Sequence, residues 1–182
     1  MKATGIVRRI DDLGRVVVPK EIRRTLHIRE GDPLEIFTDR EGEIILKKYS
    51  PIGELSGFAR QYADALAQAS GHIVSITDRD QHIAVSGQGK KELFGKNISK
   101  GLEKMIHQRI SSCCSSKDKE FTELVDENGE AYKFQVICPI IAEGDAIGSV
   151  ILTTREDQCK MGEVERKLSS AAANFLGRQM EQ

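Results

Sequence analysis

The side chains best suited to chemistry in this sequence are arginines and lysines gathered near its beginning. Residues 1–29 hold eight Lys and Arg against three acids, a balance of +5, so the rest of a chain with net charge −1 carries −6. A basic segment on an acidic body favours an anionic partner for that segment alone. The guanidinium of arginine can form two parallel hydrogen bonds with a phosphate or with the edge of guanine. The candidate contact residues are Arg8, Arg9, Arg15, Lys20, Arg23 and Arg24.

The alternative for these charges is an ordinary solvated helix surface. On a helix with 100° per residue, Ile22 and Leu26 fall on one side and are expected to be buried. The basic side chains share the remaining exposed arc, in the order Arg23, His27, Lys20 and Arg24. Such clustering, with three more arginines in the segment just before it, favours an anion-binding surface.

The elements that must position these residues are short. β-Branched runs at 4–10 and 15–18, separated by "DDLG", predict two strands joined by a turn. Pro19 suits the first position of a short helix over 20–28. Residues 34–39 and 43–49 predict a second hairpin around Gly42. Lys47 and Lys48, on its last strand, are expected to serve solubility.

About fifty residues with two aromatic side chains, Phe37 and Tyr49, make a poor core for an isolated monomer. Their apolar strands would also leave edges open to pairing. Dimerisation solves both difficulties and doubles the arginine set across a two-fold axis.

A boundary with Pro51 and two glycines separates this segment from a second region of about 125 residues. Periodic apolar residues predict helices over about 54–69 and 161–180. Strands are expected at 72–77 and 82–87, followed by a broken helix over 91–112. Two long strands are expected around the turn "ENGE", at about 120–126 and 131–141. The nearly all-apolar run 146–154 predicts a strand in the centre of a sheet.

Patterns for catalysis or metal binding are weak. Cys113 and Cys114 with His107 match no usual zinc spacing, and His72 and His82 lack a third ligand. The glycines and lysines of 85–92 lack the spacing of a phosphate loop. Because no nucleophile with a base and no pair of acids appears, we expect neither an enzyme nor a cofactor.

The stretch "TGIVRRIDDLGRVVVPKEIRRTL" closely resembles the AbrB family of bacterial transition-state regulators, and the whole chain resembles two-domain members of that family. The resemblance implies a swapped-hairpin, β-barrel-like dimer that binds double-stranded DNA. The basic residues that match the family pattern are Arg8, Arg15, Arg23 and Arg24, with Arg9 and Lys20 as helpers. It further implies a sequence-selective regulator, an activator or a repressor, of sporulation-type genes.

The element order after residue 51 resembles a GAF domain, a fold used to bind small effectors or to dimerise. The motif for cyclic nucleotides in that family is absent. The two long helices, 54–69 and 161–180, either cover only their own sheet or pair with a second chain and link two dimers into a homotetramer. We expect the second, because Ala171 and Ala172 permit close helix approach.

The sequence thus predicts an α+β fold, with a swapped-hairpin DNA-binding domain at 1–51 and an α/β GAF-like regulatory or oligomerisation domain at 52–182. An unidentified small-molecule effector is a further expected partner. The alternative function is an antitoxin-like partner-binding module with the same DNA-binding head. No apolar run approaches the roughly 20 residues needed to cross a bilayer, and no signal core is present, so we expect a cytoplasmic, nucleoid-associated protein.

Overall fold

The computed structural model describes residues 6–54, 56–88, 90–126 and 132–181. The chain divides into two compact units, Met1–Tyr49 and Ser50–Gln182. Each unit is described by itself below.

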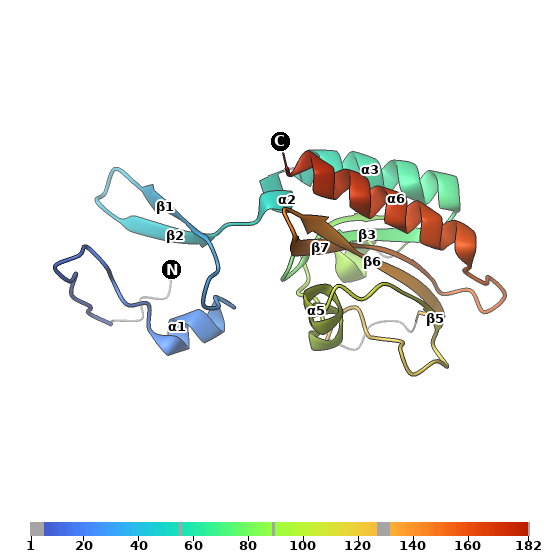
Figure 1. Ribbon diagram of the computed structural model, residues 1–182, viewed down its shortest axis with the longest axis horizontal. Helices are drawn as coiled ribbons and strands as arrows, with labels where there is room; N and C mark the ends of the chain where they lie inside the picture. The colour runs from blue at the N-terminus through green and yellow to red at the C-terminus, as the bar shows by residue number, and fades with distance from the viewer. Residues whose placement is uncertain (1–5, 55, 89, 127–131, 182) are drawn as a thin grey trace. The chain divides into compact units, whose positions relative to one another are not determined.

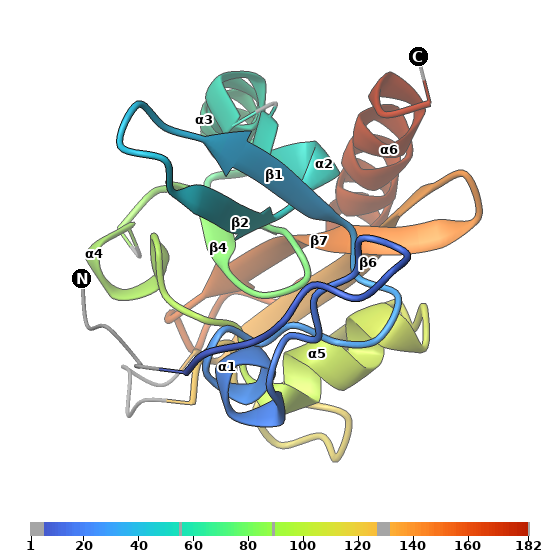
Figure 2. The ribbon, with the colours of Figure 1, turned by 90° about the vertical axis from the view of Figure 1, so that its left-hand side faces the viewer.

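In the described part of the N-terminal unit, residues 6–49, one hairpin and one short helix are formed. Strands β1 (Leu34–Thr38) and β2 (Ile44–Lys48) pair antiparallel, with Phe37 opposite Ile45, and lie side by side in Figures 1 and 2. The predicted second hairpin is therefore confirmed. Helix α1 spans Lys20–Thr25, and Pro19 lies directly before it as the N-cap residue.

The first predicted hairpin forms only its turn. Neither 6–10 nor 15–18 is a strand, so the prediction of strands at 4–10 and 15–18 is wrong for the single chain where the chain is described. Consequently the described residues close no barrel. A strand needs a neighbour for its backbone N–H and C=O groups. Here the Asp11 N–H donates to the Arg15 carbonyl, which closes only the turn.

Helix α1 is shorter than the predicted 20–28 and buries less. Ile22 is half-buried, whereas Leu26, expected to be buried, is 54% exposed. His27 takes a positive φ of 52°, which ends the helix. Only Pro19 is buried among described residues 6–49. The unit therefore has almost no core of its own.

The C-terminal unit is built on a five-stranded sheet in the order β4-β3-β7-β6-β5. Its strands are β3 (Ile73–Thr77), β4 (His82–Ser86), β5 (Ser112–Ser115), β6 (Phe134–Ala142) and β7 (Asp145–Thr154). The apolar strand predicted at 146–154 is the central one, as expected. All pairings are antiparallel, so this domain is α+β in detail, although it was expected to be α/β.

Helices cover both faces of this sheet (Figure 1). Helices α3 (Ser56–Ser70) and α6 (Glu163–Gln179) lie side by side on one face, after the one-turn α2 (Pro51–Glu54). Helices α4 (Lys90–Leu93) and α5 (Lys100–His107) belong to the other face. Two separate apolar clusters fill the spaces between the helices and the sheet. The predicted long helices and the predicted broken helix are confirmed.

The packing of α6 on the sheet is close enough to require glycine. A methyl group added at Gly177 would overlap the carbonyl of Ile141 on β6. Small residues therefore face the sheet on both long helices: Ala59 and Ala63 on α3, Ala172 and Ala173 on α6.

The predicted apolar stripes of these helices do not all point inward. Val164 and Phe175 of α6 are 65% and 41% exposed, and Ala171 is exposed as well. Phe58 of α3 is also exposed, and it lies with Tyr62 and Phe175 in an aromatic cluster with ring centroids 5.6–6.3 Å apart. The large side chains thus form a second, outward-facing apolar stripe.

The strand predicted at 120–126 is not formed, and β5 at Ser112–Ser115 takes its place beside β6. The backbone of 120–126 bonds elsewhere: the carbonyl of Leu124 accepts from Ser99 N and from the His82 ring, and the Gln135 amide pairs with the backbone of Thr122. Those groups are therefore not available for a ladder. The predicted turn "ENGE" (127–130) lies outside the described residues.

Candidate nucleic-acid interface

The turn at 11–15 fixes one arginine in place. Asp11 Oδ1 accepts hydrogen bonds from Leu13 N (3.0 Å) and Arg15 N (2.8 Å), and Gly14 supplies a positive φ of 76°. Asp11 Oδ2 accepts from Arg15 Nε at 2.8 Å. Asp and Gly are the residues that such a turn needs, because Asp caps nearby N–H groups and Gly tolerates the left-handed region. Arg15 is therefore held at the tip, with most of its side chain exposed.

The same turn geometry recurs in the formed hairpin. Asp39 Oδ1 accepts from Glu41 N (3.0 Å) and Glu43 N (2.9 Å), and Gly42 takes a φ of 82°. In both turns the Asp N–H donates to the carbonyl four residues later. Since this geometry joins β1 to β2, residues 11–15 have the geometry of a β-hairpin turn as well.

The hydrogen bonds at this turn lower the pKa of Asp11, first through the backbone N–H of Arg15 and then through its side chain. The carboxylate stays charged near neutral pH. It orients the Arg15 guanidinium through Nε and leaves its terminal nitrogens to another partner.

The remaining predicted residues are exposed with one exception. Arg8, Arg9, Lys20 and Arg24 are exposed, while Arg23 is half-buried. The Arg23 Nε is buried without a hydrogen-bond partner among the described residues. The prediction that Arg23 points fully outward is therefore wrong in the single chain, because its side chain lies partly along the unit. Among the described residues, Arg15 is the member of the six that has an ion pair.

Lys48 has a role that differs from the expected one. Its Nζ donates to the carbonyl of His27 at 2.9 Å and pairs with Asp32 Oδ2 at 3.2 Å. Burial works to raise the pKa of Asp32, but the Arg29 backbone N–H and Lys48 lower it overall. Lys48 therefore ties the end of α1 to β2, and solubility is not its main contribution. Lys47 lies over the ring of Phe37, 4.9 Å from its centroid.

The described part of the C-terminal unit shows no group of three metal-ligating side chains, Cys113, Cys114 and His107 included. His82 is buried, with Nδ1 2.7 Å from Ser75 Oγ and Nε2 3.1 Å from the carbonyl of Leu124. Burial lowers the pKa of His82 to about 4. His72, just before β3, pairs with Glu165 at 3.6 Å. Both histidines therefore have structural partners.

The exposed cations of 8–24 can neutralise phosphates and form bidentate contacts with base edges. Comparisons with known proteins agree with this interpretation. The family described as "Stage V sporulation protein T C-terminal, transcription factor" matches residues 54–181, more than half of the chain.

The chain belongs to the stage V sporulation protein T family. It is 58% identical to "Stage V sporulation protein T" of Bacillus subtilis (strain 168), and the alignment covers all of both chains. Residues 7–54 match a second family, described as "Antidote-toxin recognition MazE, bacterial antitoxin". "Transition state regulatory protein AbrB" of the same organism is 53% identical over 74 residues, 41% of this chain and 76% of AbrB.

The fold of the C-terminal unit of this family member is that of a GAF domain. It is similar to the GAF domain of an Acinetobacter phosphoenolpyruvate-protein phosphotransferase, with a TM-score of 0.57 and 14% identity. The similarity covers 69% of this chain and 81% of that one. At this identity the likeness establishes the fold only.

Sequence reasoning proposed the basic residues as candidates but missed two side-chain contacts that position this region. The Asp11 contact to Arg15 had a signal, because "DDLGR" and "DREGE" share an Asp, a Gly three residues later and the turn between them. The contact of Lys48 with His27 had no such signal in the sequence, because the two residues are 21 positions apart.

Proposed function

We propose that this protein is a sequence-selective, double-stranded DNA-binding regulator of transcription that acts on sporulation-type genes. Residues 1–51 are the proposed DNA-binding domain, and 52–182 the proposed regulatory and oligomerisation domain. The observation that carries the proposal is the set of exposed cations at 8–24, presented by a turn that holds Arg15 at its tip. Membership of a family described as a transcription factor supports it.

The proposed contact residues are Arg8, Arg9, Arg15, Lys20, Arg23 and Arg24. Contacts to phosphates would set the affinity and the register of the protein on the duplex. Selectivity would come from bidentate arginine contacts to base edges and from the sequence-dependent deformability of the duplex. If a dimer neutralises about six to ten phosphates, affinity should fall by roughly 10³ to 10⁵ between 50 and 200 mM salt. A protein with this function would act on the nucleoid, in the cytoplasm. Among the described residues, no helix has the length and apolarity that crossing a bilayer demands.

The proposed unit of binding is a homodimer through residues 1–51. The apolar side chains beside the first turn have nothing to pack on: Val7 and Val17 are 88% and 72% exposed. The second hairpin shares this property, since Ile36 and Ile44 are exposed as well. In an interlaced dimer, a second chain would pair with the segments that flank this turn and would cover the exposed apolar side chains.

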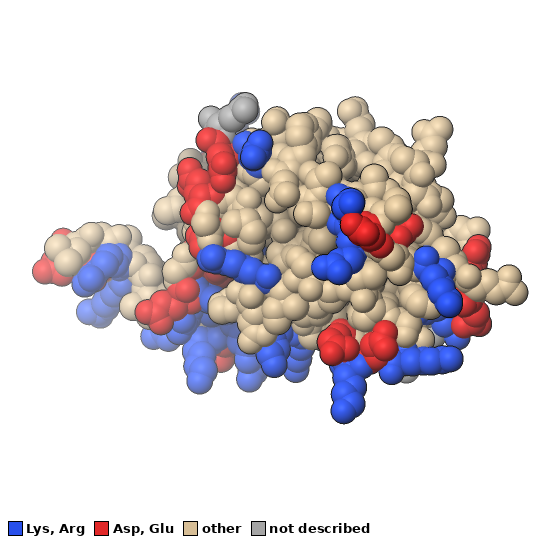
Figure 3. Space-filling view, turned by 45° about the vertical axis from the view of Figure 1, so that its right-hand side comes forward, with Lys and Arg blue, Asp and Glu red and all other residues tan. Residues whose placement is uncertain are grey.

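The proposed contact between two such dimers is the outward stripe of α3 and α6. Figure 3, in which the C-terminal unit comes forward, shows few charged side chains over its upper surface, where these helices lie. The aromatic cluster of Phe58, Tyr62 and Phe175 lies on this stripe. Its partly exposed rings support a homotetramer through helices 54–69 and 161–180.

The second candidate is an antitoxin-like module that uses the same head to bind a protein partner. The match of residues 7–54 to a family described as an antitoxin favours it. Selective DNA binding by the purified protein alone separates the two, because a partner-dependent module would need a second protein for its function.

The test is selection of duplexes from a random library by the full-length protein, followed by anisotropy titrations of the selected site. Arg15→Ala and Arg24→Ala should each weaken binding by at least about tenfold, since an arginine contact contributes roughly 1–3 kcal/mol and a dimer presents it twice. Arg40→Ala is the matched control, because Arg40 is exposed on the equivalent turn of the second hairpin. Equal affinities for wild type, Arg15→Ala and Arg24→Ala would refute the assignment.

A further inference from the structure

A solvent-open cavity of about 640 Å³ lies on the α6 face of the C-terminal unit, at the β5 edge of the sheet. It exists because α6 packs on β6 and β7, which leaves the outer strand β5 uncovered on this face. The opposite face carries α5 and its own apolar cluster. The size of the cavity lies within the range of small-molecule sites in proteins.

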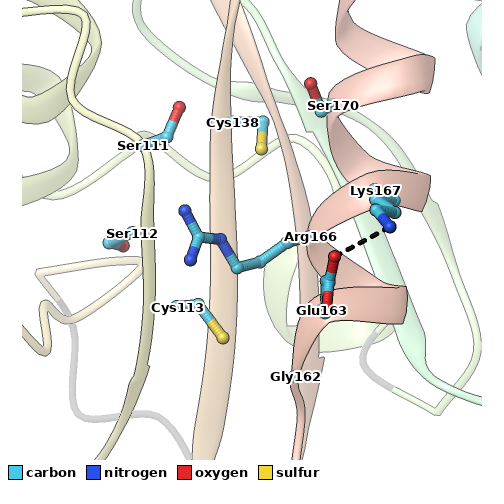
Figure 4. Close-up of a pocket in the computed structure, with 9 residues that line it drawn as sticks. All are labelled: Ser111, Ser112, Cys113, Cys138, Gly162, Glu163, Arg166, Lys167 and Ser170. Atoms are coloured by element: carbon cyan, nitrogen blue, oxygen red, sulfur yellow. Dashed lines mark ion pairs between the residues drawn. The ribbon is translucent and has the colours of Figure 1, made fainter.

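One cation reaches into this cavity without an acidic partner. The side chain of Arg166 extends from α6 between Ser111 and Cys113 (Figure 4). No ion pair or hydrogen bond joins its guanidinium to another group in the described parts of the chain. The acids beside it are already engaged.

The charged side chains next to Arg166, in contrast to it, have partners. Lys167 pairs with Glu163 at 2.8 Å, and in Figure 4 the Arg166 side chain extends away from this pair. Glu165 accepts from Gly162 N at 2.7 Å and pairs with His72 at 3.6 Å. The free cation of this region is therefore Arg166, as far as the structure describes it.

The strand side of the cavity is neutral and offers hydrogen bonds, whereas its α6 side also carries the paired charges of Glu163 and Lys167. The strand side is lined by Cys113 of β5, by Ser111 just before β5, and by Cys138 of β6. Burial raises the pKa of both the Cys113 and the Cys138 thiols, although Arg166 acts to lower them. The thiols are thus uncharged at neutral pH and do not neutralise Arg166. Ser170 adds a hydroxyl from α6.

We propose that this cavity binds a small organic anion, whose carboxylate or phosphate group the Arg166 guanidinium holds, with the Ser111 and Ser170 hydroxyls beside it and the two thiols against its apolar body. A guanidinium without an acid partner, next to hydroxyls and uncharged sulfur, selects an oxyanion over a cation or a neutral ligand. The inference goes beyond DNA binding and does not rest on it, because the site lies wholly in the C-terminal unit.

The test uses the rate at which iodoacetamide alkylates Cys113 in the full-length protein, resolved by mass spectrometry, with inorganic phosphate and succinate as probes. Either anion should slow the alkylation of Cys113 saturably, by about tenfold once the anion concentration is ten times its Kd. For a ligand held by one charged group, the expected Kd is about 1 mM. Alkylation of Cys159, outside the cavity, should not change. Sodium chloride at equal ionic strength controls for screening.

Arg166→Gln should abolish this protection. Arg178→Gln, a change at another exposed arginine further along α6, should keep it. Arg166→Lys retains the charge without the planar fork and should protect more weakly. Circular dichroism confirms that each variant is folded. Protection by phosphate alone assigns a phosphate ligand, and protection by succinate alone a carboxylate. No protection by either anion up to about 10 mM, or equal protection in Arg166→Gln, overturns the proposal.

Discussion

Acidification should destabilise the C-terminal domain through one buried histidine, His82. Its ring is fully enclosed, and burial lowers its pKa from 6.5 to about 4. The folded domain therefore keeps His82 neutral, with Nε2–H donating to the Leu124 carbonyl and Nδ1 accepting from Ser75 Oγ. In the unfolded chain the same side chain takes up a proton near its ordinary pKa.

Proton linkage gives the direction and the size of this effect of pH on the free energy of unfolding. Because the unfolded state binds the proton first, the stabilisation is complete above pH 6.5 and is lost as the pH falls toward 4. For these two pKa values the loss is about 2 kcal/mol between pH 7 and pH 5. This is a large share of a typical domain stability of about 5–15 kcal/mol. Most carboxyl groups titrate below this window, so His82 dominates it.

The assay is urea unfolding of the full-length protein, followed by far-ultraviolet circular dichroism at several pH values from 7 to 5. His82→Gln keeps a donor and an acceptor but cannot titrate, so its stability should change by about 2 kcal/mol less across the window than that of the wild type. His107→Gln, a change at an exposed histidine on α5, is the control and should behave as the wild type. If wild type and His82→Gln lose the same free energy between pH 7 and pH 5, the reasoning is refuted.

Three further predictions concern packing and assembly. Gly177→Ala should lower the free energy of unfolding by about 1–3 kcal/mol, because its methyl group would overlap the Ile141 carbonyl; a smaller loss in chemical denaturation would contradict this. Lys48→Met should weaken DNA binding although Lys48 is not a proposed DNA contact, because the substitution removes the hydrogen bond that holds the His27 end of α1. Amide hydrogen exchange in residues 20–28 should become faster, and unchanged exchange would contradict this role of Lys48. Phe175→Ser should convert a tetramer into dimers in light scattering, and a wild type that is only dimeric would exclude the tetramer.

The sequence was most informative where one physical effect dominates. The run 146–154 is nearly all apolar, which only a strand covered on both faces accommodates, and β7 is that strand. The two long helices were predictable from periodicity, but the side that faces the sheet was not. The apolar stripes of these helices were expected to pair with a second chain, but periodicity did not show that the close approach of helix and sheet selects alanine and glycine inside and leaves Phe175 outside.

Long-range hydrogen bonds account for the main errors. Residues 120–126 have the composition of a strand, yet His82 and Ser99 occupy the Leu124 carbonyl, and no local pattern reveals contacts 42 and 25 residues away. The first hairpin is a different case. Its Asp-Gly turn was predictable and forms, but strands at 6–10 and 15–18 need a neighbouring strand, which the chain alone does not supply.

The central claim is that the basic residues at 8–24 contact the phosphates of a DNA duplex, twice per dimer. The most direct test is the dependence of the binding constant on salt for the wild type, Arg15→Ala and Arg40→Ala. Each phosphate contact contributes about 0.9 to the slope of log K against log salt, so Arg15→Ala should reduce the steepness by about 2 for a dimer, and Arg40→Ala should leave it unchanged. A slope for Arg15→Ala equal to that of the wild type would contradict the account.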